Sequence, residues 1–121
     1  AADPKSSAVR HEETALFLNR TLRSGTRIEF AGHVVVLGDV NPGAEIVAEG
    51  NVIIWGRLRG MVHAGAQGNR NAVICALDLS PTQLRIAEEV SAILKPRDNP
   101  KPEIARINKA GKLQAEFWSP G

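Results

Sequence analysis

The residues best suited to metal binding or catalysis are few and widely spaced. The chain has three histidines, His11, His33 and His63, and one cysteine, Cys75. A structural zinc site uses Cys and His ligands, of which two are usually about two to four residues apart. None of these four residues has such a neighbour, and one cysteine cannot supply a thiolate cluster. We therefore predict no metal site and expect the histidines to lie on the surface.

Other stretches have the composition of a catalytic or phosphate site without its arrangement. Glu12 with Glu13, and Glu88 with Glu89, are neighbours along the chain, which does not place two carboxylates across a cleft. The segment GAQGNRN, residues 65–71, lacks the Gly-Lys-Ser/Thr ending of a phosphate-binding loop and is predicted to be a corner with an insertion. No Ser, His and Asp residues are arranged in a way that suggests an activated nucleophile. The sequence favours a binding module without a cofactor over an enzyme.

The composition is that of an ordinary soluble domain. The 121 residues suffice for one domain with a core, and 43% of them are apolar against 23% charged. Net charge is only +2, and the basic excess lies in residues 95–121, which usually indicates a solvated terminus rather than a nucleic-acid arm. There is no internal disulfide, no run of the ~18 apolar residues that a membrane span needs, and no signal peptide. We expect a cytoplasmic protein that neither binds nucleic acid nor inserts into the membrane.

An internal repeat must position any binding residues. Gly32, Gly50 and Gly68 recur with a period of 18, and the segment after Gly32 aligns with the segment after Gly50. A third, looser copy, NAVICALDLSPTQLRIAEE, follows a short insertion. The chain is therefore predicted to form three coils of this period.

A shorter period of six residues indicates the shape of each coil. Every sixth residue forms an apolar column: Leu16, Leu22, Ile28, Val34, Val40, Ile46, Val52, Leu58 and Ala64. A helical period of 3.6 cannot produce such a column, whereas three short strands joined by tight corners can, with Gly or Ala at the corners. Coils of this kind stack at about 4.8 Å, the spacing of neighbouring strands. We predict an all-β fold, a short triangular β-helix with the column facing inward.

The same register sorts the outward side chains into three faces. The first face is apolar outside as well, with Phe17, Val35, Leu37, Ile53 and Trp55, continued by Val73 or Cys75. The second face is rich in arginine and carries Arg23, Gly25, Asp39, Asn41, Arg57, Arg59 and Met61. The third is mixed. An apolar outer face on a soluble solenoid predicts an interaction surface.

The ends of the chain are less regular than its middle. We expect residues 1–13 to be an interdomain linker and residues 14–94 to be the β-helix domain. Residues 95–121 are expected to form a proline-rich loop and then a terminal hairpin or cap around the turn KAG. The stretch SPTQLRIAEEVSAIL has helical propensity, but a strand at 83–87 is preferred because the third coil requires one.

Residues 20 to 90 closely resemble the C-terminal domain of the bacterial septum-site determining protein MinC. The string GDVNPGAEIVAEGNVIIWGRLRGMVHAGA carries the resemblance in order and spacing. The resemblance implies a right-handed β-helix, a homodimer through one sheet face, and binding to the membrane-associated ATPase MinD in its ATP-bound state. It also implies inhibition of FtsZ assembly, which keeps the division ring from wrong sites, and recruitment to the inner face of the membrane through MinD. In this family an N-terminal domain carries much of the inhibition, so we expect this chain to be the C-terminal module of a longer protein.

The resemblance also implies where each partner binds. The family motif for MinD is Arg-Ser-Gly-Gln, and here the positions are Arg23, Ser24, Gly25 and Thr26, so the fourth departs from the pattern. The independent register places this motif on the second face, and we predict that the contact extends to Asp39, Arg57 and Arg59. The dimer is expected to use the apolar first face, Phe17, Val35, Leu37, Ile53 and Trp55. A competing interpretation is that the C-terminal segment covers Trp55.

Two other protein classes share coils of this period and stay open from the residues alone. A hexapeptide-repeat acyltransferase would need more coils, a trimer and a catalytic histidine in a subunit groove. A bactofilin-like cytoskeletal β-helix would stack end to end into filaments without a nucleotide-dependent partner.

Overall fold

The computed structural model describes residues 14–91 and 98–120, and all its regular elements are β-strands. In chain order they are β1 (Ala15–Leu18), β2 (Arg27–Phe30), β3 (His33–Leu37), β4 (Glu45–Ala48), β5 (Val52–Leu58), β6 (Met61–Ala64), β7 (Ile74–Leu79), β8 (Gln83–Ile86), β9 (Glu89–Val90), β10 (Glu103–Ile107) and β11 (Leu113–Phe117). No helix in the described part of the chain is long and apolar enough to cross a membrane. The predicted all-β class is confirmed. Residues 1–13, expected to be a linker, lie outside the described residues.

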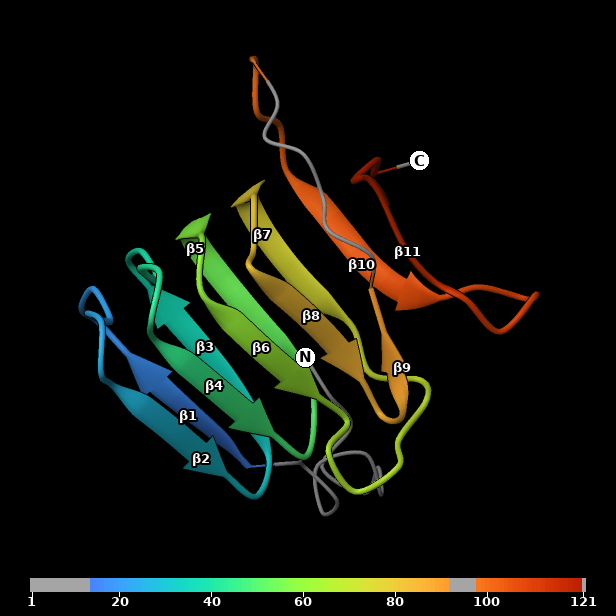
Figure 1. The fold of residues 1–121 in the computed structure, drawn as a ribbon, viewed down its shortest axis with the longest axis horizontal. Coiled ribbons are helices and arrows are strands. Elements are labelled where there is room, and N and C mark those ends of the chain that lie inside the picture. The colour runs from blue at the N-terminus through green and yellow to red at the C-terminus, as the bar shows by residue number, and fades with distance from the viewer. Residues whose placement is uncertain (1–13, 92–97, 121) are drawn as a thin grey trace, which may run out of the picture.

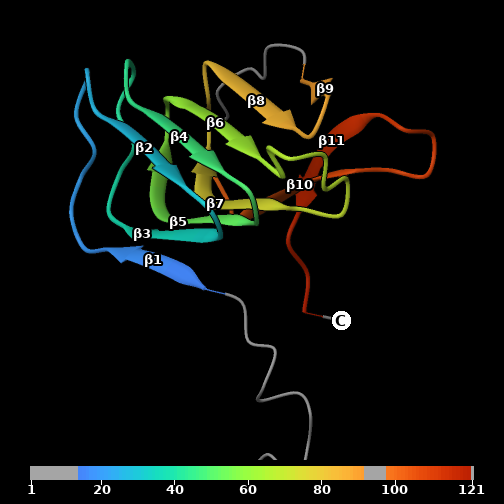
Figure 2. The ribbon, with the colours of Figure 1, turned by 90° about the horizontal axis from the view of Figure 1, so that it is seen from below.

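Strands from successive turns of the chain lie side by side in two stacks (Figure 1). One sheet has the order β1-β3-β5-β7-β10-β11 and the other the order β2-β4-β6-β8-β9. In the first sheet Leu16 pairs with Val34, and Val34 pairs with Val52, so each residue lies beside its equivalent in the next coil. Seen from below, the two stacks form separate layers (Figure 2). The described residues form four coils, with β1, β3, β5 and β7 in one stack and β2, β4, β6 and β8 in the other, so the prediction of three coils was wrong. The aligned copies begin at Gly32 and therefore omit the coil of β1 and β2.

The apolar column faces inward, as the period of six predicts. Seven of its nine members are fully buried: Leu22, Val34, Val40, Ile46, Val52, Leu58 and Ala64. Leu16 and Ile28 are half-buried because they belong to the first coil, which has a neighbouring coil on one side only. The core therefore consists of aliphatic side chains between the two sheets and the third side of the coil.

That third side, the predicted second face, is joined by single bridges between its first three coils, and the ends of β5 and β7 pair on it in the last two. Leu22 pairs with Val40, and Val40 pairs with Leu58, in parallel but isolated bridges. A tight turn follows directly after Leu22 and after Val40, so the backbone leaves the extended conformation before a strand can form. Backbone turns thus shape this face in the first two coils, and strands continue onto it only in the last two.

Glycine recurs at the corner between the first and second faces because the coils come very close there. A Cβ atom on Gly56 would lie 2.2 Å from the carbonyl oxygen of Gly38. A Cβ atom on Gly38 would lie 2.5 Å from the carbonyl oxygen of Arg20, one coil earlier. Contacts this short involve backbone atoms of the neighbouring coil, which cannot rotate away as a side chain could. The predicted use of glycine at corners is confirmed here, and close approach is its physical reason.

The period of 18 breaks at the next corner of the third coil. Glu45 pairs with Met61, whereas an unbroken repeat would pair it with His63, because Arg59 and Gly60 replace the longer turn of the preceding coil. A Cβ atom on Gly60 would lie 2.5 Å from the carbonyl oxygen of Ala44, so only glycine fits this shortened corner. Met61 therefore lies in β6, on the third face and not on the second as predicted. The insertion within residues 65–71 restores the stacking, and Val52 pairs with Ile74.

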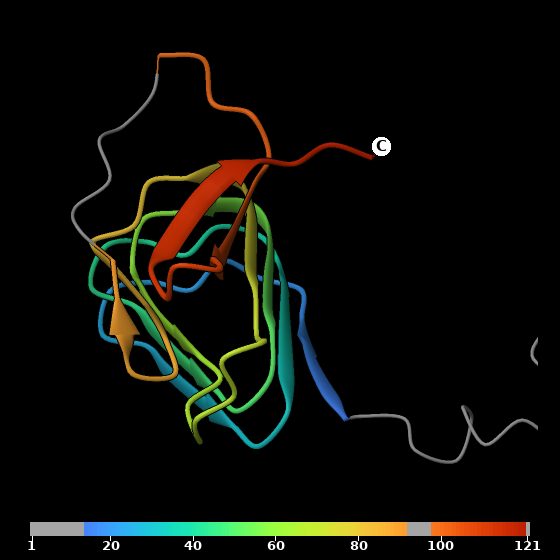
Figure 3. The same cartoon turned by 90° about the vertical axis from the view of Figure 1, so that its right-hand side faces the viewer.

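The C-terminal segment covers one end of the solenoid. β10 and β11 pair as an antiparallel hairpin around the KAG turn, and β10 also pairs antiparallel with β7. The hairpin crosses the end of the stacked coils (Figure 3). Ala105 is fully buried, and Ile107, Leu113 and Ala115 pack against the core. The strand preferred at 83–87 is confirmed as β8.

Candidate functional site

The motif at residues 23–26 forms a tight turn on the second face. The backbone N–H of Thr26 donates to the carbonyl oxygen of Arg23 at 3.0 Å, which closes the turn. Gly25, the third residue of the turn, has a φ of 89°, the left-handed conformation that a type II turn requires at this position. A Cβ atom on Gly25 would meet no atom within 4 Å. The glycine is therefore required by the backbone, and the space in front of it is open.

The next coil repeats this turn directly beside it. The backbone N–H of Ala44 donates to the carbonyl oxygen of Asn41 at 3.0 Å, and Gly43 has a φ of 87°. The backbone N–H of Gly25 donates to the carbonyl oxygen of Gly43 at 3.0 Å, which joins the two turns. A Cβ atom on Gly43 would lie 2.3 Å from Oγ of Ser24. The two turns are thus packed together, and the Ser24 side chain lies directly against Gly43.

Three outward residues follow the three bridged core residues and form a column. Arg23, Asn41 and Arg59 come directly after Leu22, Val40 and Leu58. At about 4.8 Å per coil, Arg23 and Arg59 start roughly 10 Å apart along the stack. Nη2 of Arg59 lies 3.5 Å from Oδ1 of Asn41. Nε of Arg59 is buried and has no hydrogen-bond partner within the described ranges. The column therefore presents two guanidinium groups, one of which has an unused donor.

A second column on this face contains an ion pair. Oδ1 of Asp39 accepts the backbone N–H of Arg57 at 2.8 Å, and Oδ2 lies 3.2 Å from Nη2 of the same arginine. The Arg57 backbone N–H, together with its guanidinium and the charge of Arg59, holds the pKa of Asp39 below its ordinary value, although partial burial opposes the shift. Asp39 is therefore a carboxylate at neutral pH and orients Arg57. The structure brings all seven predicted second-face site residues, Arg23, Ser24, Gly25, Thr26, Asp39, Arg57 and Arg59, onto neighbouring coils of one side.

The five residues predicted for the first face also share one surface. Phe17, Leu37, Ile53 and Trp55 are exposed, and Val35 is half-exposed between them. The strand register places Phe17, Val35 and Ile53 side by side, and Cys75 continues this row on β7. Burial raises the pKa of the Cys75 thiol. Of the two residues expected to continue the apolar row, Val73 and Cys75, it is Cys75 that does so.

The C-terminal segment contributes a part of this surface that the repeat does not predict. Ile104 on β10 pairs with Cys75 and lengthens the row, and Trp118 lies just beyond β11. Trp55 remains 61% exposed, so the described C-terminal residues extend the apolar face instead of covering Trp55. The aromatic pair in the sequence EFW was a signal that could have indicated this contribution.

The residues first considered for chemistry have structural roles where they are described. Nδ1 of His33 accepts the backbone N–H of Asn51 at 2.8 Å, and Nε2 of His63 lies 2.9 Å from the carbonyl oxygen of Ala87. Arg70 forms ion pairs with Glu88 and Glu89 across the corner insertion. No group of three or more His, Cys, Asp or Glu residues could hold a metal ion within residues 14–91 and 98–120. His11, Glu12 and Glu13 lie outside the described residues.

Comparison with known proteins identifies relatives over nearly the whole chain. The family model for the septum formation inhibitor MinC, C-terminal domain, matches residues 16–118. A probable septum site-determining protein MinC from Gloeobacter violaceus is 53% identical over 104 residues, which cover 85% of this chain and 37% of that protein. A probable septum site-determining protein MinC from Clostridium acetobutylicum is 50% identical over 111 residues, which cover 91% of this chain and 52% of that protein. The chain thus spans about a third to a half of these relatives.

A solved structure shares the fold as well. One chain of the MinC:MinD cell division protein complex of Aquifex aeolicus matches with a TM-score of 0.82 and 41% sequence identity. The match covers 89% of this chain and 89% of that chain. The stacked coils described above therefore also occur in a chain of that complex.

Proposed function

Because this chain belongs to the family of septum formation inhibitor MinC C-terminal domains, we propose that it is the module through which a division-site inhibitor binds MinD and pairs with a second copy of itself. The chain spans about a third to a half of its curated relatives, so the activity of the whole protein is also part of the proposal. That activity is to prevent FtsZ rings from assembling at the wrong sites. The module acts by binding, without catalysis and without a cofactor.

The observation that carries the MinD assignment is the column of Arg23, Asn41 and Arg59 beside the open glycine of the motif turn. A guanidinium offers several donors in a rigid fork, which suits carboxylate or carbonyl acceptors on a partner. The Arg59 side chain is only partly buried and its guanidinium lies 3.5 Å from Oδ1 of Asn41, so it can extend the contact proposed for Arg23. The open space at Gly25 allows a partner backbone to approach the turn closely. The likeness to a chain from a MinC:MinD complex supports this choice of partner.

The proposed self-association uses the first face. Its exposed side chains are apolar, and a contiguous apolar surface on a monomer is the feature expected of an interface. The MinD-binding face and the dimer face are different sides of the coil, so both partners can be bound at the same time. A dimer would then present two MinD-binding faces, and it would reach the inner face of the membrane through MinD.

The proposal is tested by co-sedimentation of the protein with MinD on lipid vesicles, in ATP and in ADP. We expect recruitment in ATP and little in ADP, because MinD changes its surface when it dimerises on binding ATP. Recruitment that is equal in both nucleotides would contradict the nucleotide dependence. Absence of recruitment in either nucleotide would contradict the partner.

A further inference from the structure

We propose that a groove on the first face, completed by the C-terminal hairpin, receives the Trp55 ring of a second copy of this chain. The inference rests on the proposed self-association and names the contact that dominates it. Trp118 is assigned a role in pairing that neither the repeat nor the motif predicts.

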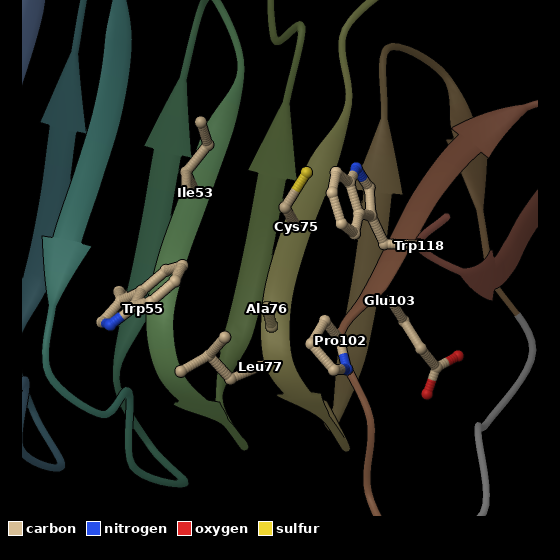
Figure 4. A pocket seen from close by; sticks show the side chains of 8 residues that line it. All are labelled: Ile53, Trp55, Cys75, Ala76, Leu77, Pro102, Glu103 and Trp118. Carbon is tan, nitrogen blue, oxygen red and sulfur yellow. The ribbon is translucent and has the colours of Figure 1, made fainter. Parts of the chain in front are cut away.

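The groove lies where the hairpin joins the solenoid. It has a volume of about 280 Å³ and is lined by Ile53, Trp55, Cys75, Leu77, Pro102 and Trp118, together with Ala76 and Glu103. In the close view Trp55 lies at one end of the group and Trp118 at the other, with Cys75 and Leu77 between them (Figure 4). The backbone N–H of Trp118 donates to the carbonyl oxygen of Pro102 at 2.9 Å, which holds the tryptophan against the edge of the sheet.

The lining is almost entirely apolar, which restricts the occupant. Glu103 is the only charged residue of the eight, and its side chain is buried and points away from the other lining side chains (Figure 4). A charged or strongly polar segment would lose its hydration here without gaining a partner. An aromatic ring fits better: apolar cavities of about 150 Å³ hold benzene, and this groove is roughly twice that volume, enough for an indole.

The position of Trp55 identifies the occupant as a second copy. Trp55 is 61% exposed and lines one end of the groove, with Trp118 at the other end. One surface therefore carries both a projecting aromatic ring and a groove that can hold an aromatic ring. A twofold interface must be self-complementary, since each copy contributes the same patch. A ring and a hollow side by side meet that condition, because each copy can place its ring in the hollow of the other.

Trp118 also supplies area that the solenoid alone lacks. It is 57% exposed, close to the value for Trp55. An aromatic side chain buries about 150–250 Å², so the exposed parts of the two rings together amount to roughly 200–300 Å². That is about a quarter to two fifths of the ~800 Å² that each partner buries in a standard interface. Removal of either ring is therefore expected to weaken the dimer strongly.

Fluorescence tests the assignment directly, because the chain has two tryptophans and no tyrosine. In Trp55→Phe only Trp118 emits, and in Trp118→Phe only Trp55 emits. We expect the emission maximum of each variant to move to shorter wavelength over the concentration range in which sedimentation shows the dimer forming. If Trp118 keeps a solvent-exposed emission in a dimeric sample, the groove is not at the interface and the inference is wrong.

Truncation provides the second test, with a matched control in the neighbouring residue. Phe117 is 50% exposed, lies next to Trp118 in the chain, and does not line the groove. We expect Trp118→Ala to raise the dimer dissociation constant at least tenfold and Phe117→Ala to change it less than about twofold. Equal effects of the two variants would overturn the assignment while leaving the dimer itself in place.

Two other results would also overturn it. A wild-type chain that stays monomeric at all concentrations would reject the proposed self-association and the inference together. A blue shift of Trp118 that occurs only when MinD is added to a monomeric chain would show that a different protein fills the groove.

Discussion

Asp39 binds both the backbone N–H and the guanidinium of Arg57, the residue that lies beside it on the next coil. This pair ties two coils together on the second face and occupies part of the Arg57 guanidinium. Arg23 and Arg59 belong to the adjacent column, where Asn41 is the intervening residue. The two columns of one face therefore differ in what they offer a partner.

The Asp39–Arg57 pair predicts a specific dependence of stability on acid. The pKa of Asp39 is lowered in the folded chain, so its contribution to stability is present above its unfolded pKa of about 3.9 and is lost as the pH falls through the folded value. Asp39→Asn should therefore be less stable than the wild type at pH 7, by less than about 1 kcal/mol for a pair this exposed, and the difference should shrink as the pH falls below about 3.9. Urea unfolding from pH 2 to pH 7 measures this, with Asp98→Asn as a control of equal charge change. A difference that does not vary with pH would contradict the assignment.

The inward register is tested at adjacent residues of β5. Val52 is fully buried, and Ile53, the next residue, is 40% exposed. An unpaired carboxylate inside costs several kcal/mol against a total stability of about 5–15 kcal/mol, so Val52→Asp should unfold the domain. Ile53→Asp should stay folded. Circular dichroism and thermal melting compare the two, and a folded Val52→Asp with unchanged melting would show that the register is wrong.

The motif turn is tested by placing a side chain on its open glycine. Gly25→Asp should abolish ATP-dependent recruitment by MinD, because the new carboxylate would hold the partner away from the turn, and Arg23→Asp should do the same by reversing a charge. Gly68 is the matched control: its φ is 99° and a Cβ atom there also meets no atom within 4 Å. Gly68→Asp introduces the same backbone strain, roughly 1–2 kcal/mol, at a different corner. This variant should be recruited by MinD as well as the wild type is. Normal recruitment of Gly25→Asp would reject the site.

The remaining positions of the same face should have graded effects on MinD binding. Arg57→Asp should weaken binding less than Arg23→Asp, because the Arg57 guanidinium is already paired with Asp39. Thr26→Gln, which restores the usual residue of the motif, should be tolerated, since Thr26 donates its backbone N–H to Arg23 and accepts from Glu45 with its backbone carbonyl, and neither bond uses the side chain. Vesicle recruitment titrated with MinD ranks the variants. A stronger loss for Arg57→Asp than for Arg23→Asp would move the centre of the contact to the ion-pair column.

The dimer face is tested by a charge at its most exposed ring. Trp55→Glu should give a folded monomer, because pairing would bury two carboxylates near the twofold axis without partners. Sedimentation equilibrium gives the oligomeric state and circular dichroism the fold. MinD recruitment should persist, since the second face is unchanged. A Trp55→Glu protein that remains dimeric would place self-association elsewhere.

The sequence predicted the parts of the fold that repeat and failed where the repeat changes. The column through Val34 and Val52 identifies the inward face because six-residue spacing is incompatible with a helix. The shortened corner at Gly60 was hidden, since both Val62 and Ala64 are apolar and either could continue the column. The motif turn was located by resemblance and by register independently. Trp118 could not be placed, because its position depends on an antiparallel pairing with β7 that no period encodes.

The reversal of chain direction at β10 restricts how a molecule of this kind can change in length. A parallel edge can be extended by another coil of the same type, but on the first sheet the edge of β7 is occupied by a strand that runs the opposite way. A duplicated coil therefore cannot be added beyond β7, but it can enter between existing coils, for example at the corner marked by Gly50. Such an insertion would add one coil of about 4.8 Å between Asn41 and Arg59. The distance from Arg23 to Arg59 along the stack would increase by the same amount. An insertion at this corner would thus change the spacing of the proposed MinD-binding residues, whereas a coil added outside them would not.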